Sequence, residues 1–156
     1  MLAIQVRGLI KKYPKKIAVD GINLEVRAGE IFALLGPNGA GKTTTVEILE
    51  GYRNRDGGEV NVLGEDPSHL GKRSGIWRNR IGIVLQSTKD AEDLTVKEFV
   101  SHFANYYKYP RNPIQVIDEV GLTEKLDSRI ETLSGGQRRR LDVALGIIGN
   151  PEILFL

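Results

Sequence analysis

The sequence predicts an α/β fold with a parallel sheet, on the basis of where its apolar residues gather. Residues Ile31–Leu35 are continuously apolar, as expected for a strand that is covered on both faces. Similar runs at Ile81–Leu85 and Ile153–Leu156 predict two further buried strands. By contrast, Ala3–Arg7 and Ile22–Val26 alternate between apolar and polar residues, which predicts two half-buried strands.

The helices are predicted from apolar spacing and capping residues. Thr95 and Glu98 have the spacing of a capping box before a helix that starts at Val96. Asn112-Pro113 opens a shorter helix with Ile114, Ile117 and Val120 on its apolar side, and Gly121 closes it. A helix is expected at Thr43–Glu50, capped by Gly51, and a turn at Asp56-Gly57-Gly58 leads into a short strand that ends near Leu63. A further helix is expected after Ser134, with Leu141, Ala144, Leu145 and Ile148 buried.

Composition indicates one globular domain. The chain has 156 residues, of which 40% are hydrophobic and 27% charged, and a net charge of +2 that gives no reason to expect nucleic acid as a partner. The basic pairs Lys11-Lys12 and Lys15-Lys16 are interpreted as solvated loop. Cysteine is absent, which excludes disulfides and thiolate metal sites. Apolar runs fall far below the ~20 residues that span a bilayer, so membrane association is expected to need a partner.

A phosphate-binding loop is the clearest motif. Residues 36–43 match G-x-x-x-x-G-K-[ST] without a mismatch, after a predicted buried strand and before a predicted helix. Glycines let successive backbone N–H groups point at a phosphate chain, and the helix start adds a favourable dipole. Lys42 is expected to neutralise the β- and γ-phosphates, and the Thr43 hydroxyl is expected to complete part of a Mg²⁺ shell.

A second anion site is predicted at Leu133-Ser134-Gly135-Gly136-Gln137. Ser134 has the position of a helix cap and Gln137 that of a capping box partner. Two glycines in a first helical turn cost roughly 1 kcal/mol each relative to alanine, so they make sense if something must approach the backbone. The alternative is a well-made helix start and nothing more.

A phosphate loop followed by a Ser-Gly-Gly-Gln helix resembles the nucleotide-binding domain of ABC transporters, and the match covers the whole chain. The resemblance implies a P-loop NTPase (RecA-like) core with an antiparallel β subdomain and an inserted helical subdomain, incomplete at the C-terminus. The core and β subdomain correspond to residues 1–86, the helical subdomain with the signature motif to residues 87–150, and the start of the Walker B strand to residues 151–156.

The resemblance also implies ATP and Mg²⁺ as cofactors and gives residues their roles. Tyr13 is at the place of the aromatic that stacks on adenine, and Gln86 at that of the glutamine that reaches Mg²⁺ and the attacking water. Catalytic roles fall to Lys42 and Gln86, and metal binding to Thr43 and Gln86. The expected nucleotide-binding residues are Tyr13, Gly36, Pro37, Asn38, Gly39, Ala40, Gly41, Lys42, Thr43, Thr44, Ser134, Gly135, Gly136 and Gln137.

The family's Walker B strand is followed by a magnesium-binding aspartate and a catalytic glutamate, which the sequence does not contain. The chain is therefore expected to be a fragment of a longer protein that binds nucleotide without turning it over. Neither His69 nor His102 is assigned the family's role of sensing the γ-phosphate. Residues Ser87–Leu94 correspond to the surface that receives the coupling helix of a membrane subunit.

The resulting hypothesis is an ATPase subunit of an ABC transporter, most similar to bacterial ABC-2 or drug-resistance exporters. Its expected partners are a second ABC domain, in a head-to-tail dimer, and a transmembrane permease that holds it at the inner face of the cell membrane. The alternative within the family is a soluble ATPase of DNA repair or translation, but no coiled-coil or cysteine-rich insertion separates the two motifs. A GTPase is disfavoured because the D-x-x-G match at Asp118–Gly121 lies at a helix end and no N/T-K-x-D motif accompanies it. A pure binding module remains open.

Overall fold

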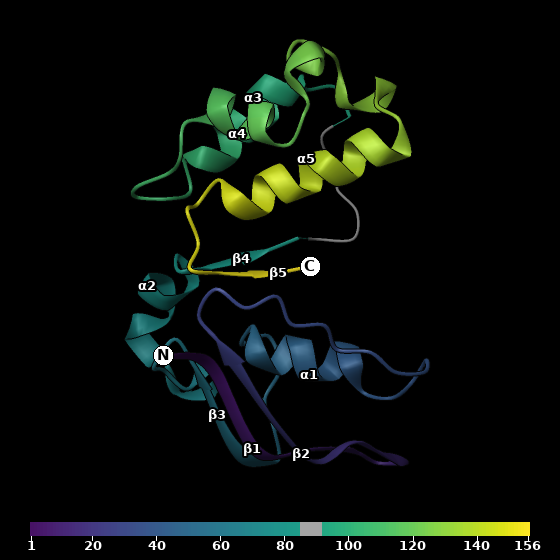
Figure 1. Cartoon of the computed structure of the whole chain (residues 1–156), viewed down its shortest axis with the longest axis vertical. Coiled ribbons are helices and arrows are strands. Elements are labelled where there is room, and N and C mark those ends of the chain that lie inside the picture. Colours follow the sequence, from purple (N-terminus) through teal and green to yellow (C-terminus); the bar gives the residue numbers. More distant parts are fainter. Residues whose placement is uncertain (85–91) are drawn as a thin grey trace. The chain divides into compact units, whose positions relative to one another are not determined.

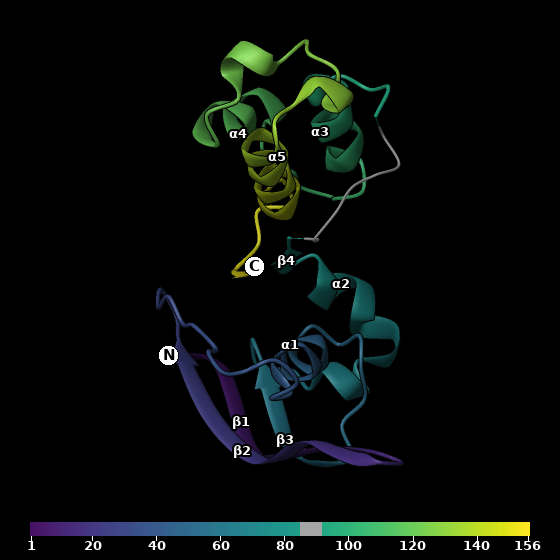
Figure 2. The same ribbon diagram turned by 90° about the vertical axis from the view of Figure 1, so that its right-hand side faces the viewer.

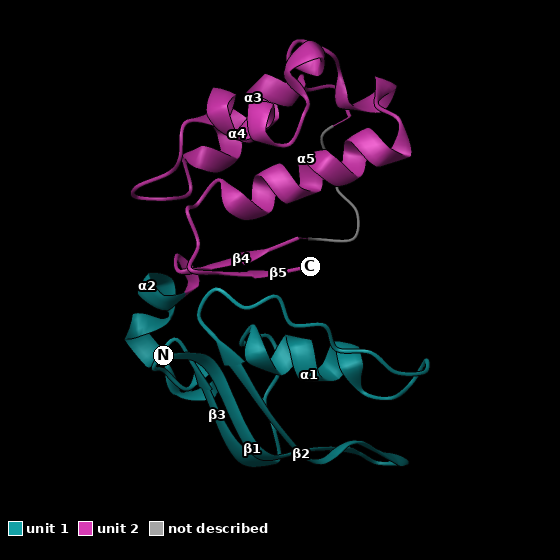
Figure 3. Cartoon of the chain, viewed as in Figure 1, with its two compact units in different colours: residues 1–77 teal, residues 78–156 magenta. Residues whose placement is uncertain are grey.

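The structure is a computed structural model that describes residues 1–84 and 92–156, with its elements labelled in Figure 1. The chain forms two compact units, Met1–Trp77 and Arg78–Leu156, which Figure 3 distinguishes by colour. Each unit has its own sheet, so each is described separately.

An antiparallel sheet forms the base of the first unit. It consists of β1 (Leu2–Tyr13), β2 (Lys16–Arg27) and β3 (Gly57–Val62) in the order β2-β1-β3. A tight turn joins β1 to β2, with Tyr13 paired to Lys16. The predicted strands at Ala3–Arg7 and Ile22–Val26 are confirmed as parts of longer strands. Their buried side chains are Ile4, Val6, Leu9, Val19 and Val26.

Helix α1 (Lys42–Leu49) lies against one side of this sheet, as Figure 2 shows. Its buried residues are Thr45, Ile48 and Leu49, so only one face of this short helix is buried. Gly51 follows the helix with φ of 75°, in agreement with its predicted role as a cap. The unit continues through the 3₁₀ turns η1 (Pro67–His69) and η2 (Gly71–Arg73) into α2 (Ser74–Arg78).

Sequence patterns did not reveal α2, which is only five residues long. Its Trp77 is 2% exposed, and the indole N–H donates to the Val62 carbonyl oxygen at 3.0 Å. A buried tryptophan needs such an acceptor for its ring N–H. This side chain therefore anchors α2 on the end of β3.

The prediction of a buried strand at Ile31–Leu35 is wrong in this structure. The segment belongs to neither described sheet, and Ile31 and Leu35 are 100% and 88% exposed. A continuous apolar run shows that a segment is suited to burial, but a strand also needs a neighbouring backbone to bond its N–H and C=O groups. Within the first unit, β1, β2 and β3 bond to one another and leave this segment without a strand partner.

The second unit contains a short parallel pair, β4 (Ile81–Ile83) and β5 (Ile153–Phe155), with Gly82 opposite Leu154. Both strands were predicted as buried elements of a parallel sheet, and their parallel pairing is confirmed for Ile81–Ile83 and Ile153–Phe155. The prediction of burial holds for the start of β4 but not for β5, which is half-buried, nor for Leu156, which is exposed. Leu85 lies outside the described residues. The pair is fixed at its start by Arg80, whose guanidinium donates to both oxygens of Glu152 at 2.6 and 3.0 Å.

Three helices form the core of the second unit: α3 (Val96–Ala104), α4 (Pro113–Glu119) and α5 (Gly135–Ile147). The turns η3 (Thr123–Lys125) and η4 (Ile130–Thr132) connect α4 to α5. The capping box at Thr95 is confirmed, as is the cap at Asn112. Ile114 corrects the expectation for α4, because it is 44% exposed while Val116 and Ile117 are buried. The buried side chains predicted for α5 are confirmed.

Candidate functional site

The phosphate loop, residues 36–43, leads directly into α1 in the first unit. Gly39 and Gly41 have φ of 81° and 83°, a region in which only glycine is unstrained. Gly41 also precedes the helix, and a Cβ built there would lie 2.1 Å from the Ala18 carbonyl oxygen. The motif glycine at this position is therefore required by the fold of the unit itself.

The start of α1 is left open for an anion. Gly41, the residue before the helix, has no side chain with which to cap it, and the first turn itself contains no acidic residue. The helix thus presents backbone N–H groups and the positive end of its dipole. Thr45 donates its backbone N–H and its hydroxyl to the Gly41 carbonyl oxygen at 2.8 and 2.9 Å, which fixes where the loop ends.

Lys42 folds back over the loop. Its ammonium donates to the carbonyl oxygens of Gly36 at 2.7 Å and Pro37 at 2.8 Å. These acceptors are neutral, and a negatively charged phosphate oxygen would bind the same ammonium more strongly. The predicted loop residues, Gly36, Pro37, Asn38, Gly39, Ala40, Gly41, Lys42, Thr43 and Thr44, are all exposed or half-buried, so the loop is accessible on its unit.

The β1–β2 turn approaches the same loop and carries the predicted adenine-stacking residue. Tyr13 ends β1 and is 38% exposed. Opposite it, Lys16 donates from its ammonium to the Gly39 carbonyl oxygen at 2.7 Å. The place of Tyr13 near the nucleotide was predicted from the family resemblance alone. The contact of Lys16 with the loop was not predicted, because it depends on how the turn packs.

The interpretation of both basic pairs as loop is wrong for Lys11, Lys12 and Lys16, which belong to β1 or β2, although Lys12 and Lys16 are exposed to solvent as predicted. The Lys11 ammonium pairs with Asp56 at 3.0 Å, and the Lys12 backbone N–H donates to the other oxygen of Asp56 at 2.6 Å. These two bonds, with the backbone bond as the larger cause, lower the pKa of the Asp56 carboxyl below its ordinary value. The cluster fixes the end of β1 beside the turn before β3.

Glu50, which follows α1, has an unusual protonation equilibrium. Its pKa is raised to about 7, first because the carboxyl is half-buried and second because the Glu47 carboxylate lies nearby. Glu47 itself pairs with the Arg53 guanidinium at 2.6 Å. The end of the helix that carries the phosphate loop is thus sensitive to pH near neutrality.

The second predicted anion site lies in the other unit, at the start of α5. The Ser134 hydroxyl accepts from the Gln137 N–H at 3.3 Å, and the Gln137 side chain accepts from the Ser134 N–H at 2.9 Å. The capping box is confirmed in this way. Around Gly135 and Gly136, a built Cβ would meet nothing within 4 Å. Neither glycine is required by packing within the described chain. This is the arrangement expected if a ligand or another chain approaches the backbone at the helix start.

Gln86, His69 and His102 are the other residues considered in the sequence analysis. Gln86, predicted to reach Mg²⁺ and the attacking water, lies outside the described residues. In the described ranges, 1–84 and 92–156, no three His, Cys, Asp or Glu side chains are grouped so as to hold a metal ion. His69 bonds Asp66 at 2.9 Å, and His102 bonds the Tyr106 hydroxyl at 3.0 Å.

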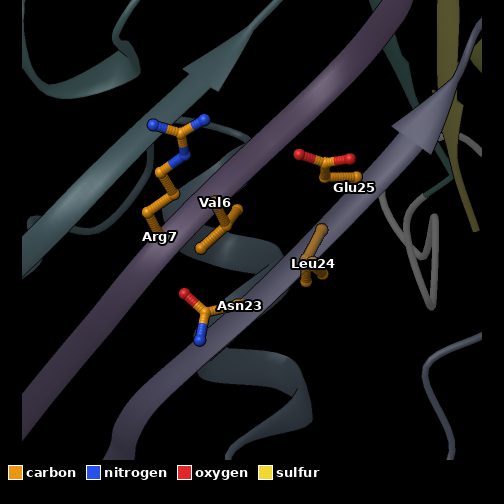
Figure 4. A pocket seen from close by; sticks show the side chains of 5 residues that line it. All are labelled: Val6, Arg7, Asn23, Leu24 and Glu25. Atoms are coloured by element: carbon orange, nitrogen blue, oxygen red, sulfur yellow. The ribbon is translucent and has the colours of Figure 1, made fainter.

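A surface pocket on β1 and β2 has no counterpart in the predicted site. Figure 4 shows its lining residues, Val6, Arg7, Asn23, Leu24 and Glu25. The Asn23 side-chain oxygen already accepts from the Gly8 N–H at 2.8 Å. None of these residues belongs to the phosphate loop, so the pocket is not part of the predicted nucleotide site.

Comparison with known proteins identifies the family. The family described as "ABC transporter" matches residues 19–156. The chain belongs to the ABC transporter family. The match starts after Tyr13, so this residue's role still rests on the resemblance and on its position beside the loop.

Named relatives of this ABC transporter chain are ATP-binding proteins of exporters or resistance systems. Nod factor export ATP-binding protein I of Ralstonia nicotianae is 38% identical over 98% of the chain and 48% of its own length. Linearmycin resistance ATP-binding protein LnrL of Bacillus subtilis is 35% identical over 98% of the chain and 51% of its own length. The chain thus spans about half the length of the curated relatives it matches.

Solved structures agree with the predicted fold class. The structure of cbiO1 from Clostridium perfringens, described as part of the ABC transporter complex cbiONQ, has a TM-score of 0.85 and 27% identity. The similarity covers 98% of this chain and 64% of that one. The fold is accordingly the α/β P-loop NTPase fold of ABC ATPase domains, as predicted.

Proposed function

We propose that the chain is the nucleotide-binding part of an exporter ATPase, which binds ATP with Mg²⁺ and couples its hydrolysis in the whole protein to transport. The observation that carries the proposal is the phosphate loop, whose glycines, open helix start and Lys42 are arranged for an anion in a chain of the ABC transporter family. The names of the relatives, which refer to Nod factor export and linearmycin resistance, support export as the direction.

Phosphate binding would proceed by exchange of partners at Lys42. Its ammonium exchanges the carbonyl oxygens of Gly36 and Pro37 for oxygens of the β- and γ-phosphates. The N–H groups that follow Gly41 bond the same phosphates, since they point along the helix axis out of α1. Lys16 holds the Gly39 carbonyl from the β1–β2 turn, which keeps that oxygen away from the incoming anion.

The donor set fits Mg²⁺. Thr43 is exposed in the first turn of α1 and offers a hydroxyl oxygen beside the phosphates, and Mg²⁺ shares its octahedral oxygen shell between protein, phosphate and water. Bound there, the ion would neutralise charge on the phosphates. Gln86 is proposed as a second ligand and as the group that orients the attacking water.

The signature helix is proposed to act on nucleotide held by a second copy. Ser134, Gly135, Gly136 and Gln137 form a helix start that no side chain of the described chain covers at its two glycines. A helix start of this kind suits the γ-phosphate of a nucleotide bound to a neighbour's loop. Two chains in head-to-tail arrangement then form two composite sites.

A permease partner is proposed to place the protein at the inner face of the cell membrane. Among the helices of residues 1–84 and 92–156, each is too short or too polar to cross a bilayer. The cbiO1 structure is described as part of a transporter complex, which supports a comparable association here. Ser87–Leu94, the proposed docking segment, lies mostly outside the described residues.

The composite-site proposal is tested with the whole protein and two variants. Ser134→Arg should block closure and Lys42→Ala should block nucleotide binding, so each homodimer should be inactive. In a mixed dimer both defects fall on one site and leave the other intact, so phosphate release and ATP-dependent dimerisation should return, with a maximum near equal amounts. If neither returns at any ratio, the signature helix does not serve a neighbouring chain.

A further inference from the structure

The ring of Tyr13 lies close to two cations of the first unit. The Lys11 ammonium lies 5.8 Å from the ring centroid, and the Arg53 guanidinium carbon lies 5.7 Å from it. Both distances fall within the ~6 Å over which a cation is attracted to an aromatic face. Lys11 is a neighbour of Tyr13 in β1, but Arg53 belongs to a different segment, between α1 and β3.

Arg53 is itself fixed by a single residue of α1. Its Nε donates to the Glu47 carboxylate at 2.6 Å, and its backbone N–H donates to the Glu47 carbonyl oxygen at 3.1 Å. Side chain and backbone are therefore anchored together. This matters because an arginine without such an anchor loses considerable side-chain entropy when it is held over a ring.

The anchor connects the two ends of the proposed nucleotide site. Helix α1 starts at Lys42 in the phosphate loop, and Glu47 lies five residues further on, about 7.5 Å along the helix axis at 1.5 Å per residue. One helix thus carries the phosphate loop at its start and, through Glu47 and Arg53, the contact that holds Tyr13. The position of the ring is tied to the position of the loop.

A ring at the end of a strand needs such a tie if it is to bind a base well. Tyr13 is 38% exposed, so part of the ring is open for stacking. A tyrosine that must give up rotamer freedom on binding loses affinity, whereas a ring already held in place avoids that cost.

We propose that Arg53 is a positioning residue for Tyr13: the Glu47–Arg53 pair holds the ring in register with the phosphate loop and so sets the affinity for the base of the nucleotide. The inference rests on the proposed function, in which Tyr13 stacks on adenine, and names a residue that acts through it. Arg53 is therefore expected to affect binding of the base and to leave binding of the phosphates unchanged.

The test compares Mg²⁺-ATP with Mg²⁺-tripolyphosphate, which has the phosphates but no base, by calorimetry on the full chain. Arg53→Met keeps the length of the side chain and removes the guanidinium. It should weaken ATP binding about two- to fivefold, the size of an exposed cation–π contact, and leave tripolyphosphate binding unchanged. In a Tyr13→Ala background the same change should have no further effect on ATP.

Two more variants sharpen the result. Lys15→Met removes one charge from the β1–β2 turn, where no contact with the ring is described, and should leave ATP binding unchanged. Glu47→Gln keeps Arg53 charged but weakens its anchor, so it should weaken ATP binding in the same direction and to a smaller extent. This second variant carries the test if Arg53→Met does not fold.

The failures are distinguishable. Equal loss for ATP and tripolyphosphate, loss with Lys15→Met as large as with Arg53→Met, or an undiminished Arg53→Met effect in the Tyr13→Ala background would each overturn the role of Arg53 and leave nucleotide binding standing. Unchanged ATP binding by Tyr13→Ala would overturn base stacking together with this inference. Absence of binding of either ligand by the unaltered chain would overturn the proposed function itself.

Discussion

The ammonium of Lys16 lies 2.7 Å from the carbonyl oxygen of Gly39, so the turn between the first two strands is bonded directly to the phosphate loop. Gly39 has φ of 81°, and its carbonyl would otherwise be free to turn toward an incoming anion. The contact joins the side of the site that carries Tyr13 to the side that carries Lys42.

Replacing Lys16 by Met should therefore weaken binding of ATP and of tripolyphosphate by a similar factor, about threefold, as expected for one modest hydrogen bond. Calorimetric titration measures both. Lys15→Met is the matched control, since it removes the same charge from the same turn without a described bond to the loop. Equal effects of the two variants would show that only net charge matters.

Gly136→Ala should have opposite effects on the stability of the fold and on ATP-dependent dimerisation. The built Cβ meets nothing within 4 Å and the residue lies inside α5, so alanine should raise the free energy of unfolding by about 0.5–1 kcal/mol. In the whole protein, the same variant should lower ATP-dependent dimerisation if a neighbour's nucleotide approaches this backbone. Chemical denaturation and light scattering measure the two effects.

Gly41→Ala provides the opposite case. A Cβ at this position would lie 2.1 Å from the Ala18 carbonyl oxygen at a φ of 83°, so the Gly41→Ala variant should lose stability and nucleotide binding together.

For Gly136→Ala, ATP-dependent dimerisation as strong as that of the unaltered protein would contradict the role assigned to the signature helix.

Glu50 should make stability depend on pH. Its pKa is raised from 4.5 to about 7 in the folded chain, so the folded state binds a proton more tightly than the unfolded state. The contribution of Glu50 to stability is thus fully present below pH 4.5 and is lost as the pH rises toward about 7. Glu50→Gln should remove this loss. The free energy of unfolding of the variant, compared with that of the unaltered chain, should therefore be higher at pH 8 than at pH 5.

Thermal or urea unfolding at the two pH values measures the difference between variant and unaltered chain. Glu59→Gln, at an exposed position on β3, is the control for neutralising a carboxylate in the same unit. A Glu50→Gln chain whose stability follows the same pH curve as the unaltered chain would show that the carboxyl is not held in the half-buried position.

Local features of the fold could be predicted from the sequence because they depend on neighbouring residues. The capping boxes at Thr95 and Ser134 and the cap at Asn112 follow from spacings of two or three residues, and the structure has all of them. The buried face of α5 follows from the helical period in the same way.

Features that depend on pairing between distant segments could not be predicted. Ile31–Leu35 has the composition of a buried strand, but composition does not show which backbone will pair with it. Lys16 and Arg53 contact the candidate site through the packing of the turn and of the segment after α1, and neither contact leaves a spacing signal in the sequence. The role of Tyr13 was predicted from the family resemblance and not from a spacing pattern.

Residues 36–43 are proposed to bind the phosphates and the magnesium of a nucleotide with separate groups, and this assignment is central to the proposed function. Titration of the full chain with ATP, in magnesium and in EDTA, tests it with Lys42→Ala and Thr43→Ala. Lys42→Ala should weaken binding about tenfold or more in both solutions, because it removes a charge-assisted bond to phosphate. Thr43→Ala should weaken binding in magnesium and leave it unchanged in EDTA. Equal losses from the two variants in EDTA, or ATP binding that Lys42→Ala leaves unweakened, would contradict these separate roles.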